Sequence, residues 1–176
     1  PATFRAPNFS INGTTIKVLE KLGYLIDSSI LPGRKVKKFK IFPLLDYTNA
    51  RKDIYSPSYD DARIAGKSKL KEVPLTGNPF AVGSPIGLGY LNTYGFEKTK
   101  DAINAVEDTD YIMFLIHPWE AVDLGHFYPN LRPWLHEACK GDMEPFSELL
   151  EYVSSKYTFA TIEDVVQQFE RNQSSV

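Results

Sequence analysis

The feature that most constrains the fold is an apolar run at residues 111–116, which ends on His117 and Pro118. The run includes aromatic and β-branched residues and no charged position, which predicts a strand buried on both faces. Strands of this kind occur in sheets that are covered by helices, so the run favours an α/β fold. Pro118 has no N–H to give to a sheet ladder, and the predicted strand should therefore end at His117.

The first part of the chain follows a strand, helix, strand pattern. Residues 1–9 read as the end of a strand that turns at Pro7, and residues 12–23 have the spacing of an amphipathic helix. Residues 24–32 predict a short strand that ends near Asp27. Two strands joined by a helix favour a parallel sheet, in which the carboxyl ends of the strands lie at one edge.

The rest of the chain predicts one more strand and several helices. The strand is expected at residues 70–76, where apolar residues return after a polar stretch. Helices are expected at residues 96–107, 143–157 and 160–172, because apolar residues recur there at helical spacing.

Four other stretches have little helical or strand pattern. Residues 43–69 are polar and rich in turn formers, which predicts a long surface excursion of a single domain spanning 1–176. Residues 77–95 predict an extended wall with little regular structure, and residues 120–139 a loop with a short helix. The basic cluster at 33–40 is interpreted as a solvated loop entering a strand rather than as a phosphate site.

Composition and charge limit the function classes. The chain has 176 residues, with 20 basic against 22 acidic side chains and a formal charge of −2. This balance does not suggest nucleic acid as a partner. No run approaches the roughly 20 apolar residues that a membrane span needs, so no membrane span is expected. Cys139 is the only cysteine, which excludes a disulfide within the chain.

Three residues at predicted strand ends are candidates for chemistry. Arg5 is suited to holding a carboxylate with two hydrogen bonds, whereas its spacing alone favours a surface ion pair. Asp27 is suited either to closing the turn that follows it or to orienting an imidazole. His117 ends the apolar run, where a titratable group often has a functional task, and a core histidine is the alternative.

The other histidines do not form a recognisable metal site. His126 and His136 lack a partner at helical spacing and the nearby Cys and Asp ligands expected of zinc, and Asp123 with His126 is only a weak pair. No metal ligand is therefore assigned in this chain.

Several aromatic residues are suited to a sugar platform, because ring faces contact the C–H groups of a sugar. They are Trp119, Tyr90, Tyr94 and Phe9. Tyr and Trp are equally ordinary in a core or at its edge, so both interpretations stay open.

Taken in order, six segments resemble the polysaccharide deacetylases of carbohydrate esterase family four, the NodB-homology group. The segments are "FRAPNFS", "GYLIDSSILP", "EVPLTGNPF", "GLGYLNTYG", "FLIHPWE" and "FSELLEYVSSKYTFATIEDV". The resemblance covers nearly the whole chain. It implies part of a distorted (β/α) barrel and an enzyme that removes N-acetyl groups from amino-sugar polysaccharides.

The resemblance also assigns roles to residues. Arg5 and Pro7 fall on the family's third motif, which walls the groove, and Asp27 falls on the fourth, where an acid tunes the catalytic histidine. Leu115 and His117 fall on the fifth, where the leucine lines the acetate pocket and the histidine protonates the leaving amine. In this chemistry a metal-activated water attacks the amide and a cationic imidazole delivers a proton. Trp119 and Tyr90 are then expected to contact the sugar.

Two motifs of the family do not occur in this sequence. The first supplies the base and one metal ligand, and the second supplies the paired histidines. The chain therefore resembles the carboxyl-terminal half of a deacetylase, and the divalent metal, zinc or a similar ion, is expected only in the complete enzyme. Asn8 also stands where the family usually has Tyr, which affects a backbone contact to the substrate.

Three explanations for this half stay open: truncation of a full enzyme, a split protein completed by a companion chain, and a non-catalytic remnant that binds glycan. The expected partners are an amino-sugar polysaccharide and either the missing amino-terminal half or a companion chain, with a second copy of this chain as an alternative. A protein-interaction module is the alternative from another functional class.

Overall fold

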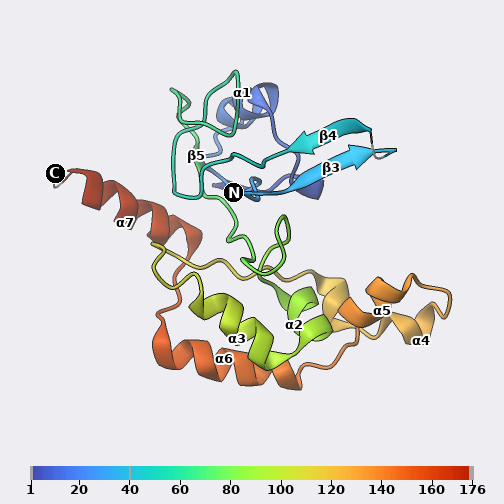
Figure 1. Ribbon diagram of the computed structural model, residues 1–176. Coiled ribbons are helices and arrows are strands. Elements are labelled where there is room, and N and C mark those ends of the chain that lie inside the picture. Colours follow the sequence, from blue (N-terminus) through green and yellow to red (C-terminus); the bar gives the residue numbers. More distant parts are fainter. Residues whose placement is uncertain (1, 40, 175–176) are drawn as a thin grey trace. The chain divides into compact units, whose positions relative to one another are not determined.

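The computed structural model describes residues 2–39 and 41–174, which form two compact units (Figure 1). The first unit comprises Pro1–Gly77, Ala81–Ser84 and Ala160–Val176, and the second comprises Asn78–Phe80 and Pro85–Phe159. Helices and strands are both present, in agreement with the expected mixed α/β class. In the described part of the chain, every helix is too short or too polar to span a bilayer.

A short parallel sheet organises the first unit. Its strands are β1 (Thr3–Phe4), β2 (Ile26–Asp27) and β5 (Lys71–Glu72), in the order β1-β2-β5. Both pairings are parallel, and the helix α1 (Gly13–Lys21) connects the first two strands. The predicted strand, helix, strand pattern and its parallel sheet are therefore confirmed, although each strand has only two residues.

Local sequence explains where α1 begins and ends. The side chain of Asn12 accepts a hydrogen bond from the backbone N–H of Thr15 at 3.0 Å, which satisfies one free donor of the first turn. Gly23 follows the helix with a φ of 82°, a left-handed conformation that glycine adopts without strain. Ile16 and Leu19 are buried in the core, where each contributes about 1.5–3 kcal/mol by leaving water.

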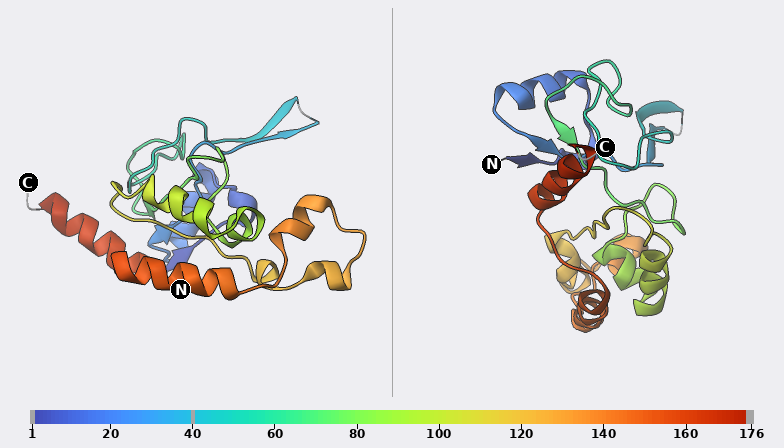
Figure 2. Two further views of the ribbon diagram at one scale, coloured as in Figure 1. Left: turned by 60° about the horizontal axis from the view of Figure 1, so that its bottom comes forward. Right: turned by 90° about the vertical axis from the view of Figure 1, so that its left-hand side faces the viewer.

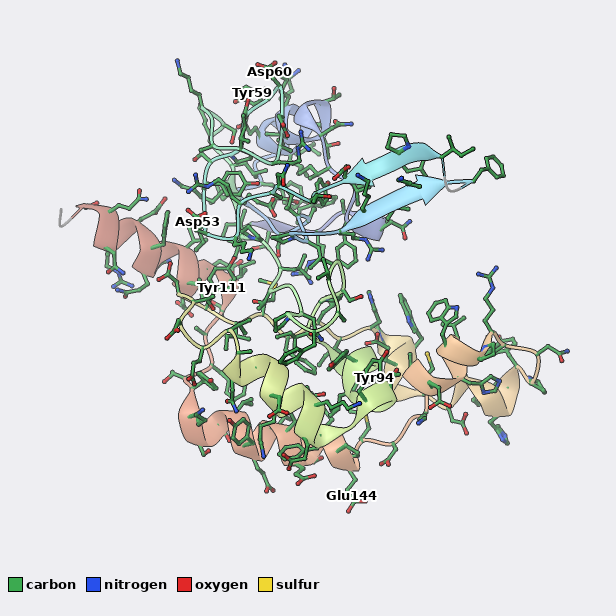
Figure 3. All side chains as sticks on the ribbon, in the orientation of Figure 1. Asp53, Tyr59, Asp60, Tyr94, Tyr111 and Glu144 are labelled. Atoms are coloured by element: carbon green, nitrogen blue, oxygen red, sulfur yellow. The ribbon has the colours of Figure 1, made fainter. Side chains whose placement is uncertain are left out.

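The segment at 43–69, predicted to be a surface excursion, has many exposed residues and also contributes side chains to the core. Tyr47, Tyr55 and Ala62 are buried and pack in the same cluster as the buried face of α1. The Tyr55 hydroxyl donates to the carbonyl of Ala62 at 2.6 Å, so a polar group is satisfied inside the segment. Tyr59, labelled in Figure 3, lies beside α1, and its hydroxyl donates to the Glu20 carboxylate at 2.9 Å.

A two-stranded antiparallel hairpin also differs from the expected loop and strand. It consists of β3 (Lys35–Lys38) and β4 (Phe42–Asp46) and extends away from α1 in Figure 1. Strand β3 therefore falls within the basic cluster that was expected to be a loop. Strand β4 covers the first residues of the predicted excursion.

The C-terminal helix α7 (Ile162–Ser174) packs on the first unit. The hydroxyl of Thr3 donates to Glu163 at 2.6 Å, and Lys71 forms an ion pair with Glu170 at 3.6 Å. Thr3 and Lys71 occupy one row of the sheet register, and side chains of successive strand residues point to opposite faces. Helix α7 therefore contacts side chains of the row that contains Thr3 and Lys71. The side chains of the next row point to the other face of the sheet.

Helices form the core of the second unit. Helices α3 (Phe96–Asn104) and α6 (Glu144–Lys156) lie side by side in Figure 1 and Figure 2 and close over a shared apolar cluster. Their positions confirm the predicted helices at 96–107 and 143–157. Helix α2 (Leu88–Tyr94) lies in the stretch predicted to have little regular structure. The stretch at 120–139 contains shorter helical turns: η2 (Pro118–Ala121), α4 (Leu124–Phe127) and α5 (Pro133–Ala138).

The apolar run at 111–116 is not a strand buried on both faces, which corrects that prediction. Its only sheet-like contact among the described residues is a parallel bridge between Gly87 and Leu115. Leu115 is 6% exposed, whereas Ile116 is 45% exposed. Ile112 and Phe114 pack against the apolar cluster beneath α3 and α6. Packing on helices, and not pairing with strands, explains the apolar composition.

Tyr47 gives a test of the first unit's core. Its hydroxyl donates to the carbonyl of Phe9 at 2.9 Å and accepts from the N–H of Ile11 at 3.1 Å. Tyr47→Phe leaves both backbone groups unsatisfied in a buried place, so unfolding should become easier by about 1–3 kcal/mol. The matched control Tyr128→Phe removes a hydroxyl from a side chain that is 62% exposed and should change the free energy by less than about 0.5 kcal/mol. Urea unfolding compares the two variants, and equal effects would contradict the prediction.

Candidate functional site

Charged side chains gather at the carboxyl ends of the parallel strands in the first unit. Asp27 ends β2, Glu72 ends β5, and Arg5 follows the last residue of β1. Asp27 and Glu72 are direct partners in the register, so their side chains point to the same face of the sheet. Both are fully inaccessible to solvent. We call Arg5, Asp27 and Glu72 the strand-end cluster.

Asp27 is held by the turn that follows it. Its carboxylate accepts hydrogen bonds from the backbone N–H of Ser29 at 3.1 Å and from the Ser29 hydroxyl at 2.8 Å. The same hydroxyl oxygen accepts from the N–H of Ala6 at 2.8 Å, which joins this turn to the chain after β1. One of the two expected roles of Asp27, closing the turn, is therefore confirmed.

Arg5 binds the same turn from the neighbouring strand. Its guanidinium donates from Nε to the carbonyl of Ser28 at 2.7 Å and from Nη2 to the Ser28 hydroxyl at 2.8 Å. Its positive charge also attracts Asp27 and Glu72. Arg5 thus fixes the turn through hydrogen bonds and offsets negative charge in the strand-end cluster.

Glu72 is a candidate that sequence reasoning missed. Its Oε1 accepts a hydrogen bond from the N–H of Ile30 at 2.9 Å, and its Oε2 has no N–H or O–H donor among the described residues. The available signal was an acidic residue inside the apolar strand predicted at 70–76. An acid at such a position must be either paired or neutral, because burial of an isolated charge is costly.

Burial sets the protonation of both acids. Removal from water raises the pKa of Asp27, and hydrogen bonds from Ser29 and the charge of Arg5 oppose that increase. The pKa of Glu72 lies well above its ordinary value, first because of burial and second because of the negative charge of Asp27. Asp27 is therefore the acid that carries the negative charge more readily.

The chain between β1 and α1 has a strained backbone. Asn8 and Phe9 have φ angles of 55° and 62°, in the left-handed region that bulky residues rarely enter. Asn adopts this conformation more easily than most residues, which accounts for Asn8 at that position. Phe9 is buried, and the guanidinium of Arg34 lies 5.0 Å from its ring centroid. Pro7 is exposed beside this turn.

His117 is presented differently, at the start of η2 in the second unit. Its backbone N–H donates to Oε2 of Glu120 at 2.8 Å. Its ring stacks on Trp119, with ring centroids 4.3 Å apart and planes 10° apart. Trp119 is 48% exposed. The stack limits the rotation of the imidazole, which is the preorganisation that a proton donor needs.

Glu120 is a second acid that sequence reasoning did not single out. Burial raises its pKa, while hydrogen bonds from the backbone of His117 and Gly89 and the charge of His117 oppose the increase. A Cβ at Gly89 would lie 2.6 Å from Oε1 of Glu120, so glycine is required for this close approach. The available signal was an acid three residues after His117, at a helical start.

Leu115 and Tyr90 are mainly packing residues in this structure. The N–H of Leu115 donates to the carbonyl of Ile86 at 2.9 Å, and its carbonyl accepts from Leu88 at 2.9 Å. The ring of Tyr90 lies 4.7 Å from the ring of Tyr94 and packs against the second unit's core. Tyr94, labelled in Figure 3, is 52% exposed. Tyr90 thus packs against the core, whereas the side chains of Tyr94 and Trp119 are about half exposed to solvent.

The structure divides the predicted site residues between its two units. Arg5, Pro7 and Asp27 belong to the first unit. Leu115, His117, Trp119 and Tyr90 belong to the second. The strand ends predict that Arg5, Asp27 and His117 converge on one groove, and this stays a prediction. In the part of the chain that the structure describes, no three His, Cys, Asp or Glu side chains are arranged to hold a metal ion.

Ser29 tests how the strand-end cluster is built. Ser29→Ala removes a donor to Asp27 and an acceptor for Ala6, so the variant should lose about 1–3 kcal/mol of stability. Loss of the donor raises the folded-state pKa of Asp27 further above its unfolded value. Both chains share the unfolded pKa of Asp, so the extra loss should increase as pH rises through the folded-state pKa of Asp27 in the natural chain, which burial raises above its ordinary value. Denaturant unfolding between acidic and neutral pH measures both effects. Ser10→Ala, at an exposed serine of the connection between β1 and α1, is the control, and a pH-independent loss equal to the control's would contradict the prediction.

Gly87 tests how the segment before His117 is held. A Cβ there would lie 2.4 Å from the carbonyl oxygen of Leu115, closer than real contacts allow. Gly87→Ala should therefore destabilise the second unit by about 1–3 kcal/mol through overpacking. Gly23→Ala is the matched control, because a Cβ there meets no atom within 4 Å and only the left-handed backbone resists it. Hydrogen exchange at the Leu115 N–H should rise in the first variant only.

Comparison with known proteins leaves the family open. No protein-family model, curated protein or solved structure matches the chain. The resemblance to polysaccharide deacetylases therefore stays an expectation from the sequence, and the geometry of the two units is what supports a function.

Proposed function

We propose that this chain is the carboxyl-terminal half of a metal-dependent polysaccharide deacetylase, which hydrolyses N-acetyl groups of amino sugars. The observation that carries the proposal is the strand-end cluster. Asp27 is buried at the end of a parallel strand, held in a tight turn, and accompanied by Arg5 from the preceding strand. Acids with burial-shifted pKa values at such strand ends are characteristic of catalytic sites.

The arrangement of the sheet supports a piece of a distorted (β/α) barrel. Strands β1 and β2 run parallel with α1 between them, which is the repeating unit of such barrels. Strand β1 has a strand partner only on its β2 side among the described residues. An open edge of this kind can accept a further strand, supplied by the missing half, a companion chain or a second copy.

The described residues do not supply a metal site of their own, as no suitable group of ligands is present in them. In the proposal the ligands lie on the segment that carries the family's first two motifs. The residues of this chain have other tasks. His117 protonates the leaving amine, and Asp27 supplies the negative charge that favours the imidazolium form. Arg5 holds the turn that aims Asp27.

Trp119 supports the substrate class. It is half-exposed, and its ring is fixed by stacking on His117, so the outer part of the ring is available to a sugar. The same observation favours the second candidate function, a non-catalytic module that binds glycan or another protein. The two candidates differ in whether His117 changes a chemical rate.

Replacement of His117 tests the catalytic role in the enzyme assembled from both halves. His117→Ala should lower turnover of an N-acetylated amino-sugar oligomer by about 100- to 10,000-fold, the range for one positioned proton donor. Metal content should stay unchanged, because His117 is not a proposed ligand. Asp27→Asn should act on the same step, so the double variant should lose much less than the product of the two single effects.

His136→Ala is the matched control, since His136 also lies in the second unit and has no proposed role. Thermal unfolding measured on the same preparations separates catalysis from folding. A His117→Ala enzyme that unfolds early yet keeps its rate would end the catalytic assignment. An oligomer that still binds to such an enzyme would favour the glycan-binding candidate.

A further inference from the structure

The hydrogen-bond donors near the Asp27 and Glu72 carboxyls are too few to stabilise a negative charge on both of them. They occupy partner positions on β2 and β5, and both side chains are 0% exposed. The two carboxyls interact, since each one shifts the pKa of the other. A carboxylate only accepts hydrogen bonds, so contact between two carboxyls requires a proton on one of them.

The partners of each acid decide where that proton lies. Asp27 accepts two hydrogen bonds from Ser29, whereas Glu72 accepts one from Ile30 through Oε1, and the backbone N–H of Ser29 also acts on the Glu72 carboxyl. The remaining oxygen of Glu72, Oε2, has no N–H or O–H donor among the described residues. An oxygen that needs a hydrogen bond but receives none is satisfied if it carries a proton and donates it.

The charges around the pair agree with one negative charge. Arg5 is the cation that acts on both acids, and it follows β1 on the Asp27 side of the sheet order. The other titratable groups that act on Glu72 are the hydroxyls of Tyr47 and Tyr55, and both tyrosines are buried. Burial raises the pKa of Tyr47 to about 12, so it is neutral at physiological pH. The single positive charge of Arg5 therefore matches a single negative charge shared by Asp27 and Glu72.

We propose that Asp27 and Glu72 share a single proton, which resides on Glu72, and that Glu72 is the positioning residue that holds the Asp27 carboxylate by donating to it. Glu72 thereby holds Asp27 in addition to the hydrogen bonds from Ser29. The inference rests on these buried groups alone and does not require the deacetylase activity. If the proposed function holds as well, Glu72 keeps Asp27 ionised and oriented for its task.

Carbon-13 NMR of side-chain carboxyls tests the proton directly in the chain as it exists. The Glu72 carboxyl signal should stay in its protonated position through the range near pH 4.3, where exposed glutamates titrate. Asp27→Asn removes the neighbouring negative charge, so the Glu72 titration should move down by about one pH unit or more. Glu120 is the matched control, because burial also raises its pKa but its partners are N–H groups and not a carboxylate. Its titration should be unchanged by Asp27→Asn.

Unfolding by urea gives a second readout that does not depend on Asp27→Asn being folded. A proton held on Glu72 in the folded state makes stability fall as pH rises above about 4.3, since the unfolded glutamate ionises there. Glu72→Gln keeps a donor to Asp27 and cannot ionise, so its stability relative to the natural chain should increase over the same pH range. Titration of Glu72 together with the exposed glutamates would overturn the proposal, and so would a Glu72→Gln difference that does not change with pH.

Discussion

The first unit is arranged around two acidic side chains that are buried in register on neighbouring parallel strands. Asp27 and Glu72 repel each other when both are ionised, and burial strengthens that repulsion because water does not screen it. Donors therefore have to come from nearby chain segments. Ser29 and the Ile30 N–H, which follow β2, supply these donors, and the positive charge of Arg5, which follows β1, offsets the negative charge. The short sheet is thus stabilised by polar contacts at its end as well as by the apolar core beside it.

The backbone conformation of the loop that follows Arg5 also costs free energy. Two consecutive residues, Asn8 and Phe9, hold left-handed backbone conformations, which cost about 1–3 kcal/mol each unless surrounding contacts impose them. Tyr47 constrains them through hydrogen bonds with the carbonyl of Phe9 and the N–H of Ile11, and the guanidinium of Arg34 lies over the Phe9 ring. The segment at 43–69 that supplies Tyr47 therefore determines the shape of the loop beside the candidate site. This is the physical reason why a stretch that looks polar belongs to the core.

Local signals in the sequence were sufficient for part of this fold. The apolar spacing of α1 predicted the helix, and the strand, helix, strand pattern predicted the parallel strands that flank it. Polarity alone misplaced the segment at 43–69, because tyrosine hydroxyls can be satisfied inside a core by backbone carbonyls. Asp27 was a candidate because its turn is local. Glu72 was missed because its significance comes from register with a strand more than forty residues away, which no local pattern encodes.

The segment before His117 shows why an apolar run cannot by itself specify a strand. A buried strand and an extended segment packed on helices have the same composition, and only hydrogen-bond partners separate them. Here Leu115 has one bridge to Gly87, and the absence of a Cβ at Gly87 permits that approach. Pro118 then begins η2, where Glu120 accepts the His117 N–H. The backbone at His117 is thus held by the Gly87 contact before it and by the start of η2 after it, so its position does not depend on a multi-stranded sheet.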